Sequence, residues 1–169
     1  MRRPAFGFTM IEVGLALAVL AILATLALPD VGRRMERQRL QGAAQGLAAD
    51  LAEARFEAAR QGQSLYVEAR AAPSRDSGWC WAVARSAGCD CAALQACQLH
   101  TVRSADWRGV RLVEGLAVTL DPGGTAAGRQ QTALLESSRG EQLRVEVSAL
   151  GRARVCASRG SWPSMPACS

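Results

Sequence analysis

The chain has 169 residues, which leaves room for one N-terminal anchor and one modest folded domain but not for several domains. All 20 basic residues are arginine, and with 15 acidic residues they give a formal net charge of +5. Acidic side chains end at Glu146, so the last part of the chain is basic only, and the planar fork of arginine suits contacts to phosphate.

An apolar segment occupies residues 8–28 and contains one charged side chain, Glu12. A transmembrane helix needs roughly 20 apolar residues, so this segment has the length to cross a membrane. A carboxylate in such a segment is costly, which makes Glu12 a candidate functional residue. A cleaved secretory signal is the alternative because Arg2 and Arg3 precede the segment, but Glu12 and the lack of a small-residue cleavage site do not suit one. We therefore expect a transmembrane helix over residues 8–28.

A helical pattern continues beyond Pro29. The proline need not end the helix, because proline near a membrane often only kinks a helix. Apolar residues recur every three or four positions, which is typical of a helix with one buried face. Gly62 suits the end of this helix. The sequence predicts one long helix whose first part lies in lipid and whose second part, residues 29–62, packs on the following domain. The apolar stripe consists of Leu40, Ala44, Leu47, Leu51, Ala54 and Ala58.

The motif Gly7-Phe8-Thr9-Met10-Ile11-Glu12, with its apolar helix and a proline at the membrane exit, resembles the start of type IV pilins and type II secretion pseudopilins. The resemblance implies a leader over residues 1–7, which a prepilin peptidase removes by cutting after Gly7. It also implies methylation of the new amine on Phe8 and an assembly role for Glu12, whose carboxylate would neutralise the N-terminal amine of a neighbouring subunit. The chain would sit in the inner membrane with a periplasmic C-terminal domain before entering a pilus or pseudopilus.

After Gly62 the hydrophobic pattern changes to the alternation of strands, most clearly over residues 143–147. Several short strands separated by turns predict an antiparallel β domain over residues 63–169, made of one or two small sheets. The expected fold class is therefore α+β, with the long N-terminal helix packed on this domain. Strands are expected at 64–70, 79–85, 98–103, 116–120, 131–137, 141–148 and 152–156.

Six cysteines in a small domain behind a membrane segment indicate disulfides formed in an oxidising compartment. Free thiols or a metal site are the alternatives, but the spacing of Cys89, Cys91 and Cys97 suits a zinc site poorly, and His100 is the single histidine. We expect no metal and no cofactor. We favour a pair between Cys156 and Cys168, because these two lie apart from the others and would tie down a proline-containing tail. The pairing of the other four stays open: Cys80, Cys89, Cys91 and Cys97.

The element Gly151-Arg152-Ala153-Arg154 follows the last amphipathic strand. Residues two apart in a strand point to the same side, roughly 6.6 Å apart, so Arg152 and Arg154 would form a two-pronged phosphate clamp. Gly151 would allow a tight turn that presents them, and Arg159 would extend the surface. Phosphate contacts of this kind are independent of sequence. The alternative is that these arginines are ordinary exposed strand residues of an arginine-rich chain.

Residues 143–156, together with the closing Pro166-Ala167-Cys168, resemble the FimT/GspH group of minor pilins and pseudopilins. The Gly-Arg-x-Arg element is similar to the DNA-binding motif of FimT proteins that take part in natural transformation. The resemblance implies a minor type IV pilin that binds DNA through Gly151, Arg152 and Arg154. Arg159, which lies outside this motif, would extend the same DNA-binding surface. A GspH-like pseudopilin of the type II secretion system, with a structural role and no DNA, is the alternative.

The expected partners are other pilins or pseudopilins, the prepilin peptidase, the inner membrane and DNA, with no small-molecule substrate. We expect no enzymatic activity. His100 is the single histidine, and the sequence shows no set of catalytic residues, such as a nucleophile with its base, that would include it. Trp79 and Trp81, which flank Cys80, are expected to pack in the core beside a disulfide and not to form a base-stacking platform.

Overall fold

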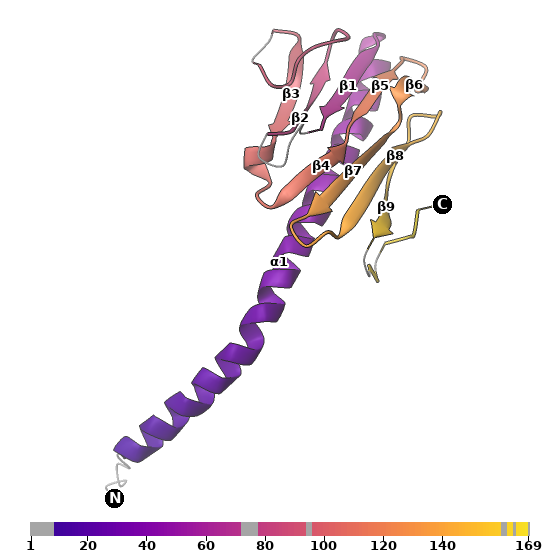
Figure 1. Cartoon of the computed structure of the whole chain (residues 1–169). Helices are drawn as coiled ribbons and strands as arrows, with labels where there is room; N and C mark the ends of the chain where they lie inside the picture. Colours follow the sequence, from indigo (N-terminus) through magenta and orange to yellow (C-terminus); the bar gives the residue numbers. More distant parts are fainter. Residues whose placement is uncertain (1–8, 72–77, 94–95, 160–161, 164, 169) are drawn as a thin grey trace, which may run out of the picture. The chain divides into compact units, whose positions relative to one another are not determined.

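The computed structural model describes residues 9–71, 78–93, 96–159, 162–163 and 165–168, with the side chains at 26–31 and 129–130 outside the description. Within these residues the predicted long helix, α1 (Met10–Gln61), precedes a set of short strands (Figure 1). The strands are β1 (Leu65–Arg70), β2 (Cys80–Ala84), β3 (Gln98–Arg103), β4 (Val110–Glu114), β5 (Leu116–Leu120), β6 (Ala126–Gln130), β7 (Thr132–Ser137), β8 (Gln142–Val147) and β9 (Ala153–Arg159). The chain divides into two compact units, Met1–Met35 and Glu36–Ser169.

The first unit contains the N-terminal part of α1. Thr9 immediately precedes the helix, and its hydroxyl accepts a hydrogen bond from the Glu12 N–H at 3.3 Å, as an N-cap residue does. Met10 and Ile11 are 95% and 82% exposed, so apolar side chains face outward here. No helical stretch in the described part of the chain combines the length and apolar character that crossing a membrane requires. The predicted leader and the cleavage pair Gly7 and Phe8 lie outside the described residues.

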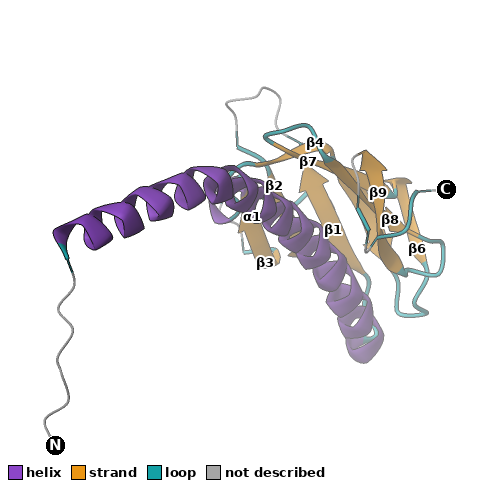
Figure 2. Ribbon diagram, turned by 90° about the horizontal axis from the view of Figure 1, so that it is seen from below, coloured by secondary structure: helices purple, strands orange, loops and turns teal. Residues whose placement is uncertain are grey.

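In the second unit α1 packs on the β domain through the predicted apolar stripe. Leu40, Leu47 and Leu51 are fully buried in one core cluster that includes residues of both sheets. Figure 2 shows this part of α1 running along one side of the strands. Gly42 allows a close approach, because a Cβ at this position would lie 2.7 Å from Cζ3 of Trp107. The prediction of a helix with one buried face is confirmed.

Two antiparallel sheets make up the β domain, in agreement with the predicted α+β class. One has the strand order β3-β2-β1-β5-β6 and the other β4-β7-β8-β9. Leu143, Val145 and Val147 of β8 are buried, and the residues between them are half-buried, as the alternation predicted. The side chains that alternate with these core residues therefore form the outer face of the second sheet.

The sequence interpretation missed β4 and β6. β4 is short and follows a 3-10 turn, and its pairing with β7 is interrupted by a bulge. β6 contains alanine and glycine, which have low strand propensity, and it exists through its pairing with β5. Gly128 makes that pairing possible, since a Cβ there would lie 2.1 Å from the Ala117 carbonyl oxygen. The expected strand at 152–156 begins at Ala153 and runs further, to Arg159.

Three disulfides tie the domain together. Cys80 pairs with Cys91 and Cys89 with Cys97, which resolves the pairing that the sequence left open. Cys156 of β9 pairs with Cys168 of the tail, the pair favoured from the sequence. The tail lies beside β9, because the Ala157 N–H donates to the Pro166 carbonyl at 2.8 Å.

Trp79 and Trp81 lie in the core, as predicted. Their exposed fractions are 3% and 0%, and their rings stack with centroids 5.3 Å apart. The Trp79 indole N–H donates to the Val110 carbonyl at 2.8 Å, and that of Trp81 donates to the Asp50 carboxylate at 2.6 Å. Both indole N–H groups therefore have hydrogen-bond partners inside the domain, and the two tryptophans have a structural role.

Candidate functional site

The β8–β9 hairpin presents the Gly-Arg-x-Arg element on a tight turn. The Ser148 carbonyl accepts a hydrogen bond from the Gly151 N–H at 2.8 Å, and the Ser148 N–H donates to the Arg152 carbonyl at 3.0 Å. Gly151 has a φ of 67°, in the left-handed region that favours glycine. A Cβ on Gly151 would lie 2.8 Å from the Gly124 carbonyl oxygen and 2.9 Å from Cδ of Arg55. The backbone conformation and the close approach both require glycine here.

This turn is fixed to two other parts of the domain. The Arg55 side chain of α1 donates from Nε to the Gly124 carbonyl at 3.0 Å. The Ala126 N–H, at the start of β6, donates to the Ala149 carbonyl at 2.9 Å. The helix, the β5–β6 turn and the β8–β9 turn therefore meet at one place, just before the start of β9.

Arg152 and Arg154 are both exposed but differ in their partners. The Arg152 backbone N–H donates to the Ser148 hydroxyl at 3.2 Å, and its side chain makes no ion pair within the described residues. Arg154 lies directly opposite Glu146 in the β8–β9 register. Its Nε and Nη2 atoms lie 2.8 Å and 2.7 Å from the same carboxylate oxygen of Glu146. The two arginines therefore do not form the uncompensated pair that the sequence suggested.

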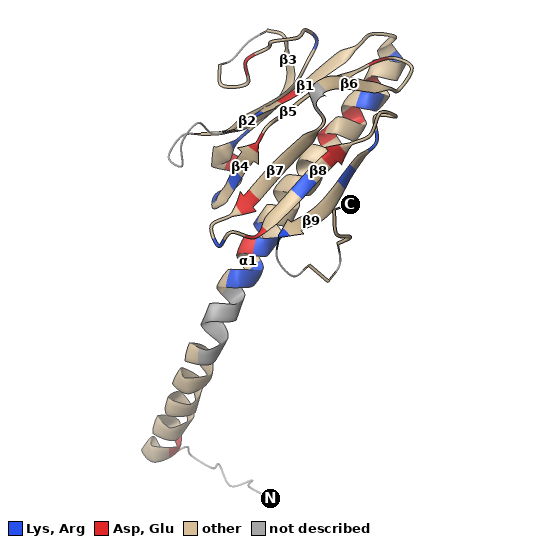
Figure 3. Ribbon diagram, turned by 45° about the vertical axis from the view of Figure 1, so that its right-hand side comes forward, with Lys and Arg blue, Asp and Glu red and all other residues tan. Residues whose placement is uncertain are grey.

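Arg159 lies at the far end of β9, about 23 Å along the strand from Arg152 at a normal strand rise. The pairing with β8 shifts by one residue near Gln142 and Leu143, and the shift places Arg159 opposite Gln142. Gln142 is on the same face as Glu146, because the two are four residues apart in one strand. The arginines thus form a row along β9 and not a single cluster (Figure 3).

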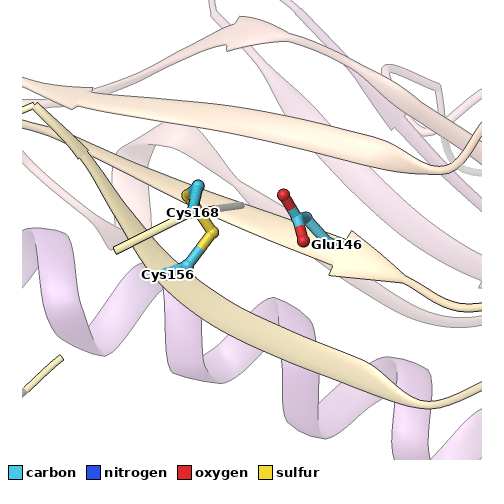
Figure 4. A group of neighbouring side chains, drawn as sticks. All are labelled: Glu146, Cys156 and Cys168. Carbon is cyan, nitrogen blue, oxygen red and sulfur yellow. A yellow bond between two sulfur atoms is a disulfide. The ribbon is translucent and has the colours of Figure 1, made fainter. Parts of the chain in front are cut away.

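Glu146 is the residue of this site that the sequence analysis missed. Its side chain is 17% exposed. One of its carboxylate oxygens and the sulfurs of Cys156 and Cys168 all lie within 4.8 Å of one another (Figure 4). Both sulfurs are bonded to each other, so this group offers no thiolate to a metal. The alternation in residues 143–147 placed Glu146 on the outer face, but only the strand register shows that it faces Arg154.

The proposed assembly residue, Glu12, lies in the first turn of α1 and is exposed. Thr9 and Glu12 have the spacing of a capping box, and the contact from the Glu12 N–H to the Thr9 hydroxyl is the forward half of that motif. A carboxylate in the first helical turn also interacts favourably with the helix dipole. Glu12 therefore has a local helix-starting role besides any contact with another chain.

Comparison with known protein families identifies the family of the chain. The family model described as Type II transport protein GspH matches residues 43–151, which is more than half of the chain. The chain therefore belongs to the GspH family, and it is a minor pilin or pseudopilin. The match ends at Gly151, so Arg152, Arg154 and Arg159 lie beyond it.

Among solved structures, the chain is similar to the type IV minor pilin FimU of Pseudomonas aeruginosa, with a TM-score of 0.45 and 21% sequence identity. The similar region covers 68% of this chain and 90% of that chain. No curated protein sequence matches the chain.

Proposed function

We propose that this chain is a minor type IV pilin that is anchored in the inner membrane, is assembled into a pilus and binds DNA for natural transformation. The observation that carries the DNA-binding part is the row of exposed arginines along the β8–β9 hairpin, Arg152, Arg154 and Arg159. No acidic side chain follows Glu146, so the row continues into a tail without negative side chains.

The chemistry of arginine supports a contact to the DNA backbone. The guanidinium fork can donate two parallel hydrogen bonds to a phosphate, and such contacts carry no sequence information. Uptake of any incoming strand requires this lack of preference. Two or three phosphate contacts imply weak binding for each subunit, with a log–log salt slope of about −2 to −3 on duplex DNA.

For the N-terminal end, we propose cleavage by a prepilin peptidase after Gly7, methylation of Phe8 and pairing of Glu12 with the amine of a neighbouring subunit. The outward-facing apolar side chains of the first unit support burial in lipid before assembly and against other pilins afterwards. Mass spectrometry of the native protein should find an N-terminus at methylated Phe8. A chain that keeps residues 1–7 would overturn this part of the proposal.

A pseudopilin of the type II secretion system is the second candidate, and two observations favour it. The matching family model is described as a type II transport protein and ends before Arg152. Glu146 also offsets the charge of Arg154. In this role the disulfide-bonded domain would contact neighbouring pseudopilins and would bind no DNA.

The full-length chain in detergent micelles, kept oxidised, tests the DNA site by fluorescence anisotropy with a labelled duplex of mixed sequence at low salt. We expect Arg152→Gln to weaken binding about three- to tenfold and to reduce the salt slope by about 0.9. Arg85→Gln is the matched control, because Arg85 is an exposed arginine that follows β2 in the other sheet. Equal losses of DNA affinity from Arg152→Gln and Arg85→Gln would refute the proposed DNA site. If the unchanged chain binds no DNA, the result favours the pseudopilin role.

A further inference from the structure

We infer that Glu146 sets the DNA affinity of the arginine row by competing with phosphate for the guanidinium of Arg154. This inference rests on the proposed DNA binding and adds an affinity-setting residue to that site. Glu146 lies on β8, outside the Gly-Arg-x-Arg element, and is brought to it by strand pairing.

The strand register makes this competition a fixed feature of the fold. Glu146 and Arg154 are directly paired across β8 and β9, and their neighbours Val145 and Val147 are in the core. A shift of the strand by one residue would expose that core, so the register is strongly fixed. The carboxylate and the guanidinium therefore face each other on the outer face in every folded molecule.

The surroundings of Glu146 keep its carboxylate at this place. Its side chain is 17% exposed, whereas that of Arg154 is 58% exposed. The disulfide between Cys156 and Cys168 lies on one side of the carboxylate (Figure 4), and Thr132 of β7 is its partner on the strand opposite β9. A carboxylate that is mostly buried needs a cation beside it, because water solvates it poorly. Arg154 supplies that cation.

A phosphate that binds Arg154 must therefore approach a carboxylate that is already there. Two oxygens held by one guanidinium at hydrogen-bond distance lie within about 6 Å of each other, where like charges repel. Arg152 makes no ion pair among the described residues and faces Ser148 across the turn, so a phosphate meets less of this repulsion at Arg152 than at Arg154. The row then consists of a strong contact at Arg152 and a weakened one at Arg154.

Glu146→Gln removes the competing charge and keeps the shape and an oxygen that can accept from Arg154. In the anisotropy assay described above, with the full-length chain in detergent, this variant should bind duplex DNA about three- to tenfold more tightly than the unchanged chain at low salt. Its salt slope should steepen by up to about 0.9, because Arg154 becomes a full phosphate contact.

Glu136→Gln is the matched control. Glu136 is also a carboxylate on the outer face of the same sheet, its side chain is 19% exposed, and it pairs with Arg111 at 2.7 Å. Both variants raise the net charge equally, so general attraction of DNA affects them alike. A gain in DNA affinity that occurs with Glu146→Gln but not with Glu136→Gln would support the inference. Equal gains in affinity from the two variants would overturn it.

A double variant separates a specific pair from a general charge effect. In a chain that also carries Arg154→Gln, the gain from Glu146→Gln should fall to that of the Glu136→Gln control, because the guanidinium that Glu146 occupies is gone. An undiminished gain would overturn the inference. If Arg152→Gln and Arg85→Gln weaken binding equally, the proposed function fails as well, whereas a loss specific to Arg152 with no gain at Glu146 rejects this inference alone.

Discussion

Replacement of Gly151 by alanine tests how tightly the β8–β9 turn is built. Gly151 combines a φ of 67° with a Cβ position 2.8 Å from the Gly124 carbonyl oxygen. Gly140, in the β7–β8 turn, offers a matched comparison. Its φ is 79°, its N–H donates to the Ser137 carbonyl at 3.0 Å, and a Cβ there would meet nothing within 4 Å.

The expected magnitudes follow from these two environments. Alanine in the left-handed region costs about 1–2 kcal/mol, and this is the whole effect expected for Gly140→Ala. At Gly151 the added methyl also meets a backbone oxygen. Forcing extra volume into a closed space costs about 1–3 kcal/mol more. Gly151→Ala should therefore lower the free energy of unfolding by about 2–5 kcal/mol.

Thermal unfolding of the full-length chain, followed by near-ultraviolet circular dichroism under oxidising conditions, measures the difference. For a domain of this size, 1 kcal/mol lowers Tm by about 3 °C, so the two variants should differ by several degrees. Equal Tm losses would show that the contact with Gly124 and Arg55 contributes nothing beyond the conformational cost, and would refute the reasoning.

Two further predictions concern α1. Gly42→Ala should destabilise the domain by about 1 kcal/mol in urea unfolding although alanine favours helices, because its methyl would meet the Trp107 ring at 2.7 Å; a gain in stability would show that the ring moves aside. Hydrogen bonds from Arg60 and then Gln61 lower the pKa of Glu57 to about 2, so Glu57 contributes stability above its unfolded pKa, and this is lost as the pH falls through about 2. Glu57→Gln should therefore lose less stability than the unchanged chain between about pH 6 and about pH 3 in urea unfolding, and identical losses would contradict the assignment.

The helix and the central strands could be predicted because their patterns are local. Leu40, Leu47 and Leu51 recur at helical spacing, and this spacing decides which face of α1 is buried. In β8 apolar residues alternate with polar or charged ones, and this alternation decides which side chains face the core. In both cases the residues themselves carry the period, and the packing follows from it.

Features that depend on distant pairing could not be predicted. β6 has little strand propensity of its own and is formed by its contact with β5, where Gly128 removes a clash. The shift that brings Arg159 opposite Gln142 depends on the course of β8 and β9 together. The pair of Glu146 and Arg154 was missed for the same reason, because no local pattern states which residues face each other across two strands.

Three hairpin turns share one hydrogen-bonding scheme, and this scheme links local sequence to the arginine row. In each turn the first residue is Ser137, Ser148 or Asp121, and its backbone carbonyl accepts a hydrogen bond from the N–H of a glycine three residues later. The side-chain oxygen of the same residue accepts a second hydrogen bond from the N–H of the residue after that glycine. The left-handed glycine at the end of such a turn fixes which residues pair first in the hairpin.

In the β8–β9 hairpin the turn leads directly to the pairs Val147 with Ala153 and Glu146 with Arg154. A turn one residue longer or shorter would shift β9, and because side chains alternate, the arginines would move toward the core face. Gly151 therefore does more than allow a bend. It fixes the register that keeps Arg154 on the outer face beside Glu146, so the glycine and the arginines of the Gly-Arg-x-Arg element act as one structural unit.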